Sequence, residues 1–211
     1  MKYPILSILI VFILLQGCVS SRNYISPDET AKKIFTPTEL EGIGQMIHFV
    51  DSIVSEKTGL TGINESYHAY FDKLTADFFN EKGFVPLLND TAKFKFFDTM
   101  ESEAFSAFWI EGLEYINRST QGRKVVTLDI RGKYMKYLQE TGKSDDPYAM
   151  VYELTYTSGT ILSASVIVWF FRNYHDLDFT VYKHRLWATV FLLSIKTYEP
   201  PETYLQNLKR E

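Results

Sequence analysis

The sequence has little cysteine and no surplus of positive charge. Cys18 is the only cysteine in 211 residues, so no internal disulfide can form and the fold must depend on its hydrophobic core. The chain carries 22 Lys and Arg against 26 Asp and Glu, a net charge of −4. Proteins that bind nucleic acid expose a basic face, so this balance argues against a nucleic-acid partner.

The sequence also lacks the common catalytic motifs. No glycine-rich phosphate loop follows a predicted strand, and no His-Glu-x-x-His motif occurs. Ser158 and Ser163 lack the flanking glycines of a nucleophile elbow. We therefore assign no catalytic residue, no metal ligand and no cofactor, and an enzyme is the less favoured interpretation.

The richest group of polar side chains lies between His175 and His184. With Asp176 and Asp178 it offers two imidazoles and two carboxylates within ten residues, which could bind zinc or another divalent ion. The favoured alternative is a solvated loop whose acidic residues precede the next helix, where the helix dipole stabilises negative charge.

Long apolar runs are rare, and the first is Ile5–Leu15, which follows the single charge of Lys2. Its length is typical of a secretory signal and too short to span a bilayer comfortably. It leads into Leu15-Gln16-Gly17-Cys18, which resembles the lipobox of bacterial lipoproteins.

The lipobox resemblance implies that residues 1–17 are a signal peptide that is removed, and that Cys18 receives the lipid. Two or three acyl chains, such as palmitate, would make a stable membrane anchor. Val19, in place of Asp, favours the outer membrane among the cell-envelope locations. Residues 18–25 would then form a lipidated tether, and residues 26–211 a single helical domain.

The second weakly charged run is Leu154–Phe171, which contains eighteen residues without a charge. Seven of them are Thr, Ser or Gly, so the run is less apolar than a membrane span requires. We expect a buried core helix whose small residues allow close packing.

Helical signals dominate the rest of the chain. Thr36, Pro37 and Glu39 form a capping motif, and a 3–4 apolar spacing then predicts a helix over Pro37–Lys57 that Gly59 ends. Other helices are expected at Pro27–Ile34 with Ser26 as the N-cap, at Glu65–Glu81, within Thr91–Asn117, after a short strand within Val125–Thr141, and at Leu186–Ile195. The sequence predicts a compact, aromatic-rich all-α domain with a minor β-hairpin near Val125.

The body also resembles uncharacterised helical lipoproteins of Bacteroidetes-type bacteria in its richness in Phe, Tyr, Ile and Lys. This resemblance implies O-glycosylation at Asp-Ser/Thr motifs, which here contain Ser52, Thr91 and Thr99. Thr91 is the favoured acceptor because it falls in a predicted loop.

Three functions remain open for a lipid-anchored cell-envelope protein. An aromatic share of 16% suits a non-catalytic module that binds an envelope protein or glycan. A hydrolase or metal-dependent enzyme would use His175, Asp178 and His184. A carrier of an apolar ligand would line a cavity with Trp169, Phe170, Phe171 and Trp187.

Overall fold

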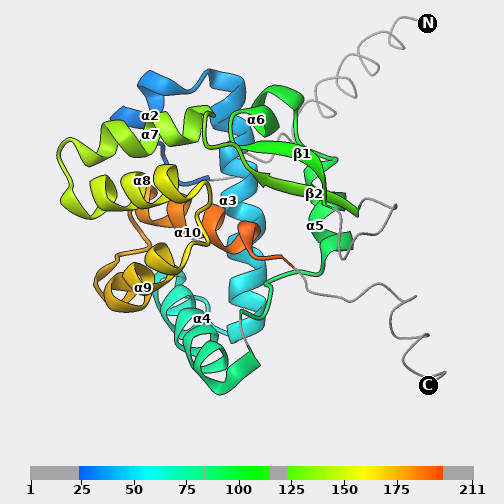
Figure 1. Cartoon of the computed structure of the whole chain (residues 1–211), viewed down its shortest axis with the longest axis vertical. Coiled ribbons are helices and arrows are strands. Elements are labelled where there is room, and N and C mark those ends of the chain that lie inside the picture. The colour runs from blue at the N-terminus through cyan, green and yellow to red at the C-terminus, as the bar shows by residue number, and fades with distance from the viewer. Residues whose placement is uncertain (1–23, 83, 115–122, 197–211) are drawn as a thin grey trace, which may run out of the picture.

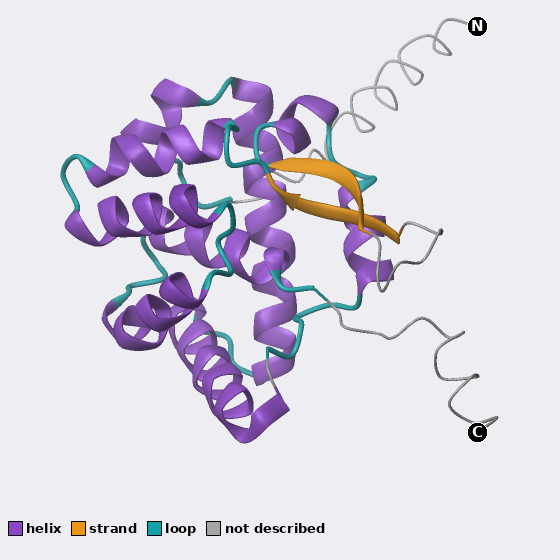
Figure 2. Cartoon of the chain, viewed as in Figure 1, coloured by secondary structure: helices purple, strands orange, loops and turns teal. Residues whose placement is uncertain are grey.

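The predicted all-α class with a minor β-hairpin is confirmed. A computed structural model describes residues 24–82, 84–114 and 123–196 (Figure 1). In this part of the chain, the structure is mostly helical, with one two-stranded antiparallel hairpin at its edge (Figure 2). The predicted signal peptide, residues 1–17, and the predicted lipid-bearing Cys18 lie outside the described residues.

A long central helix, α3, organises the other elements. In chain order these are α2 (Glu29–Ile34), α3 (Pro37–Thr58), α4 (Ile63–Asp77), the π-helix η1 (Phe78–Lys82), α5 (Asp90–Phe97), α6 (Ser102–Ser106), β1 (Trp109–Glu114), β2 (Arg123–Leu128), α7 (Lys133–Gly142), α8 (Asp146–Ser158), α9 (Ala164–Asn173), the 3-10 turn η2 (Tyr174–Asp176) and α10 (Tyr182–Ser194). Helix α3 contacts α2, α4, α6 and α10, while α7 and α8 pack together on one side of the molecule (Figure 1).

The bounds of α3 confirm its sequence signals. The Thr36 hydroxyl accepts a hydrogen bond from the Glu39 backbone N–H, and the Glu39 carboxylate accepts one from the Thr36 N–H. Gly59 ends the helix in the left-handed conformation, at φ 71°. A side chain at Gly42 would collide with Ala104, so this glycine allows α6 to pack directly against α3.

Helix α2 begins later than its sequence predicts. Asp28, not Ser26, is the N-cap, because its Oδ1 accepts a hydrogen bond of 2.7 Å from the Ala31 N–H. Both Ser and Asp are strong N-cap residues, so local sequence alone did not discriminate between them.

The prediction of one or two helices throughout Thr91–Asn117 is wrong at its C-terminal end. Helices α5 and α6 form, but β1 follows them and pairs with β2 from Trp109↔Leu128 to Glu114↔Arg123. Trp109 is buried opposite Leu128, which places the base of the hairpin in the core. Long-range packing therefore overrides the local helical pattern.

The prediction of one buried helix over Leu154–Phe171 is also wrong. Helix α8 ends at Ser158, Gly159 adopts a φ of 74°, and α9 starts after the Ser163 N-cap. The turn is stable because the Ser163 hydroxyl accepts the Val166 N–H. Within the described residues, no helix combines the length and apolar character that a membrane crossing needs.

A largely buried ion pair joins α3 to α10, with the side chains of Arg185 and Asp51 16% and 9% exposed. Asp51 on α3 accepts two hydrogen bonds from the Arg185 guanidinium, and the one from Nε is 2.8 Å long. The buried Tyr67 hydroxyl also donates to Asp51 Oδ1, at 2.9 Å. Removing one member of such a pair leaves the other charge buried without compensation.

Replacing Asp51 by Asn should lower the free energy of unfolding by about 3–5 kcal/mol, because it leaves the Arg185 charge without a counter-ion. Urea denaturation of the mature body would measure this. Glu29→Gln is the control, because its ion pair with Lys32 is exposed and should contribute nothing measurable. Equal effects of the two substitutions would contradict the role given to Asp51.

The protein should lose stability as the pH rises above about 10, the pKa of an unfolded tyrosine. Burial, the largest cause, raises the pKa of the hydroxyls listed here: Tyr67, Tyr70, Tyr134, Tyr137, Tyr148 and Tyr182. The unfolded chain therefore releases these protons at lower pH than the folded chain, and rising pH favours unfolding.

The ionisation of Lys93 has the opposite effect on stability, and it acts over a lower pH range. Burial lowers its pKa from 10.5 to about 8, so its contribution increases stability with pH only between those two values. Urea denaturation at a series of pH values from about 8 to about 12, with tyrosinate absorbance as a second probe, tests both effects. Tyrosine ionisation that precedes unfolding would contradict the prediction.

Candidate functional site

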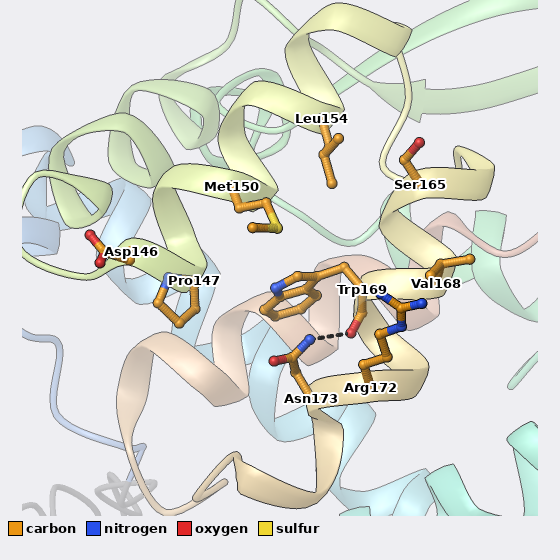
Figure 3. A pocket seen from close by; sticks show the side chains of 9 residues that line it. All are labelled: Asp146, Pro147, Met150, Leu154, Ser165, Val168, Trp169, Arg172 and Asn173. Atoms are coloured by element: carbon orange, nitrogen blue, oxygen red, sulfur yellow. Dashed lines mark hydrogen bonds between the residues drawn. The ribbon is translucent and has the colours of Figure 1, made fainter.

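An open recess lies between α8 and α9, hereafter the α8–α9 groove. Its volume is about 350 Å³. It is lined by one face of each helix, with Asp146, Pro147, Met150 and Leu154 from α8 and Ser165, Val168, Trp169, Arg172 and Asn173 from α9 (Figure 3). Residues at i, i+3, i+4 and i+7 share a helix face, so the local spacing places them together.

The walls of the groove are apolar and open to solvent. Met150 on α8 is 54% exposed and Val168 on α9 is 46% exposed. Between them, the indole of Trp169 points toward Met150 and Pro147 (Figure 3). Trp169 itself is only 5% exposed, because its ring also packs at 5.3 Å on Trp187 in the core. The groove therefore has a rigid aromatic base and accessible aliphatic walls.

Charged groups of opposite sign lie at different parts of the rim. Asp146 comes from the start of α8 and Arg172 from the last turn of α9 (Figure 3). In the described part of the chain, no other side chain forms an ion pair with either of them. The Asn173 amide donates a hydrogen bond of 2.6 Å to the Trp169 carbonyl, which orders the end of α9. The rim can therefore offer both a hydrogen-bond donor and an acceptor to a partner.

A phenylalanine patch adjoins the groove along α9. It consists of Phe78, Phe79, Phe84 and Phe171. The Phe171 ring lies 5.0 Å from both Phe78 and Phe79, and Phe79 is 68% exposed. Phe171 follows Val168 by three residues, so the patch and the groove meet on the helix surface.

The structure brings only two of the three candidate metal-ligand residues close to each other: Asp178 is a neighbour of His184, whereas His175 has a different neighbour, Asp72. His175 is exposed and lies 3.9 Å from Asp72 of α4, whereas His184 stacks at 5.9 Å on Tyr148. The Asp178 carboxylate accepts hydrogen bonds from the Thr180 N–H and hydroxyl, ordering the turn before α10. Among the described residues, no group of three His, Cys, Asp or Glu side chains could hold a metal ion.

The environment of His184 is set by burial. Burial lowers its pKa, and the adjacent Lys183 charge adds to this effect, against the opposing influence of Asp145 and Asp178. A neutral, half-buried imidazole stacked on Tyr148 is explained by packing between α8 and α10. The loop interpretation of Asp178 agrees with its hydrogen bonds to Thr180.

Glu111 and Glu114 are two nearby carboxylates that do not share one face of their element. Both lie on β1, where residues three apart point to opposite sides. Glu111 pairs with Lys124 at 2.7 Å, and Glu114 pairs with Lys196 at 3.3 Å. These contacts hold the hairpin and the end of α10 and do not form a catalytic pair.

The carrier interpretation expected four aromatic residues around one cavity. Phe170 and Trp187 are instead fully buried and lie 5.8 Å apart in a packed core. Phe171 belongs to the phenylalanine patch, and only Trp169 lines the groove. These four residues therefore divide between core and surface.

The expected glycosylation site Thr91 is exposed but does not lie in a loop. It occupies the first turn of α5, where the preceding Asp90 pairs with Lys93 at 3.3 Å. Thr99 is exposed in the turn after α5, whereas Ser52 lies within α3. Glycosylation at Thr91 remains a prediction.

Sequence reasoning did not identify the groove. Its one local signal is the presence of Met150 and Val168 outside the buried stripes of their helices. Comparison of the whole chain with protein-family models, with curated proteins and with solved structures finds no match.

Proposed function

We propose that this chain is a lipid-anchored cell-envelope protein whose body is a non-catalytic module that binds a protein segment in the α8–α9 groove. The main observation in favour of this is that Met150 and Val168 are exposed on the two sides of the groove, whose base is Trp169. The lipobox at Leu15–Cys18 supports the anchor and, with Val19, the outer membrane.

The physical case for a binding surface depends on exposed apolar area. Contiguous apolar patches on a soluble body mark interaction sites, and Met, Trp, Phe and Arg are enriched at interfaces. The groove supplies Met150, Trp169 and Arg172, and the phenylalanine patch extends it along α9. A partner that covers both would exclude water from all of these side chains.

The groove favours a protein partner over a glycan. Sugar rings stack on the open faces of aromatic side chains, but Trp169 is only 5% exposed. The accessible walls are aliphatic, from Met150 and Val168, and match an inserted apolar side chain. A recess of about 350 Å³ can accept one such side chain and leaves Asp146 and Arg172 for hydrogen bonds at the rim.

Catalysis receives less support than binding. The enzyme alternative needs His175, Asp178 and His184 at one point, but His175 lies beside Asp72 and His184 packs against Tyr148. The groove contains no histidine and no carboxylate pair. The proposed role is accordingly recognition.

Substitution Cys18→Ser should move the protein from the membrane fraction to the soluble fraction, because it removes the thiol that would carry the lipid. Fractionation followed by intact-mass measurement tests this, and Ser20→Ala should keep both the location and the acyl mass. A Cys18→Ser protein that still fractionates with membranes would overturn the anchor.

Partner binding should depend on Val168. A photo-crosslinking residue at position 168, introduced in the native host, should give a specific protein adduct that the same residue at Leu60 does not. Leu60 is a matched control because it is also exposed, at 41%, but lies outside the groove.

With the crosslinked partner purified, Val168→Glu should weaken binding by about ten-fold or more, because it places a charge in an apolar interface, while Leu60→Glu should not. Equal effects of both substitutions would remove the groove from the interface. Binding of purified envelope glycan, lost in Val168→Glu, would replace protein by glycan as the partner class.

A further inference from the structure

Four buried tyrosines gather where α7, α8 and α10 meet the start of α2. This tyrosine cluster consists of Tyr134, Tyr137, Tyr148 and Tyr182. The ring of Tyr137 lies 6.3 Å from that of Tyr134 and 6.5 Å from that of Tyr182. Asp28, the N-cap of α2, reaches the same region, where its Oδ2 accepts a hydrogen bond of 2.6 Å from Tyr137.

The other three hydroxyls of the cluster have no hydrogen-bond partner within the described part of the protein. Tyr134, Tyr148 and Tyr182 are 0%, 1% and 5% exposed. A buried polar group without a partner loses its hydration without compensation, so native structures rarely leave one in that condition. Three such groups in one region point to a shared partner.

Electrostatic interactions indicate that the Tyr148 and Tyr182 hydroxyls lie near the same carboxylate, Asp28. Burial is the largest cause of the raised pKa of Tyr148, and the neighbouring Tyr134 hydroxyl and the Asp145 and Asp28 carboxylates add to it. Burial also raises the pKa of Tyr182, with Asp28 as the further cause. All the hydroxyls therefore stay protonated near neutral pH, and each can both donate and accept a hydrogen bond.

The polar groups of the cluster determine which kind of ligand it can bind. A cation would compete with the hydrogen bonds that Asp28 already accepts from Tyr137 and from the Ala31 N–H, whereas an anion would be repelled by the Asp28 carboxylate. Water can accept from one tyrosine and donate to another or to Asp28, and buried waters make about three such bonds. The cluster is thus matched to a small neutral guest that both donates and accepts.

We propose that the tyrosine cluster is a hydration site, in which ordered water bridges the hydroxyls of Tyr134, Tyr148 and Tyr182 to the carboxylate of Asp28. An opening of about 480 Å³, lined by residues 24–27, Leu40, Glu41 and Gly44, reaches the cluster at Tyr182. The bound water ties α2, next to the predicted tether, to α7, α8 and α10.

The sign of the change in Tm in Tyr→Phe variants tests the site. If water bridges the hydroxyls, Tyr148→Phe and Tyr182→Phe each remove a bond to it and lower the Tm by about 2–4 °C. If the hydroxyls are unpaired, the same substitutions remove an unsatisfied polar group and raise the Tm. Tyr152→Phe on the partly exposed side of α8 is the control and should leave the Tm unchanged.

A crystal structure of the mature protein provides the direct observation. We expect a water oxygen within about 3.2 Å of at least two of the three hydroxyls, displaced or lost in Tyr148→Phe. The proposal stands only if the Tm falls and this water is present. A Tm that rises or stays constant, or hydroxyls that no ordered water contacts, overturns it.

Discussion

The ion pair between Asp51 and Arg185 is the constraint on which the arrangement of the helices depends. Neither charge could be buried alone, and the bidentate geometry fixes both the distance and the rotation of α10 against α3. Tyr67 donates to the same carboxylate and brings α4 into the arrangement. The aromatic core therefore forms around a polar centre whose geometry admits little variation.

The abundance of aromatic residues is explained mainly by this core. Phe71, Phe170, Trp187 and Phe191 pack with ring centres about 5 Å apart and fill the space between α4, α9 and α10. Trp169 connects that core to the surface, because one part of its ring contacts Trp187 while another forms the base of the α8–α9 groove. The shape of the groove is thus set by interior packing, which makes it rigid.

Local signals predicted much of the helical structure. The capping box at Thr36 and Glu39, the apolar spacing and Gly59 together defined α3, and the β-prone residues around Val125 indicated the hairpin. The first strand was missed because its pairing with β2 is a tertiary interaction. The break at Gly159 was missed because the absence of charge was given more weight than the left-handed preference of glycine.

The candidate site was harder to predict because it requires knowledge of which helices become neighbours. Met150 and Val168 are ordinary apolar residues in the sequence, and only the packing of α8 against α9 shows that they remain exposed. The same limit applies to Asp51 and Arg185, which are 134 positions apart and carry no local mark of their pairing. His175 and His184 are close in sequence but have different neighbours in the fold, so their spacing wrongly suggested a shared site.

The position of α10 at the end of the described chain has a consequence for biogenesis. A polypeptide is made from its N-terminus, so α3 is complete long before Arg185 exists to neutralise Asp51. Closing this contact costs the entropy of a very long loop and needs nearly the whole chain. Until then the apolar stripe of α3 lacks the cover that α10 provides, so the nascent chain exposes apolar surface that chaperones can bind.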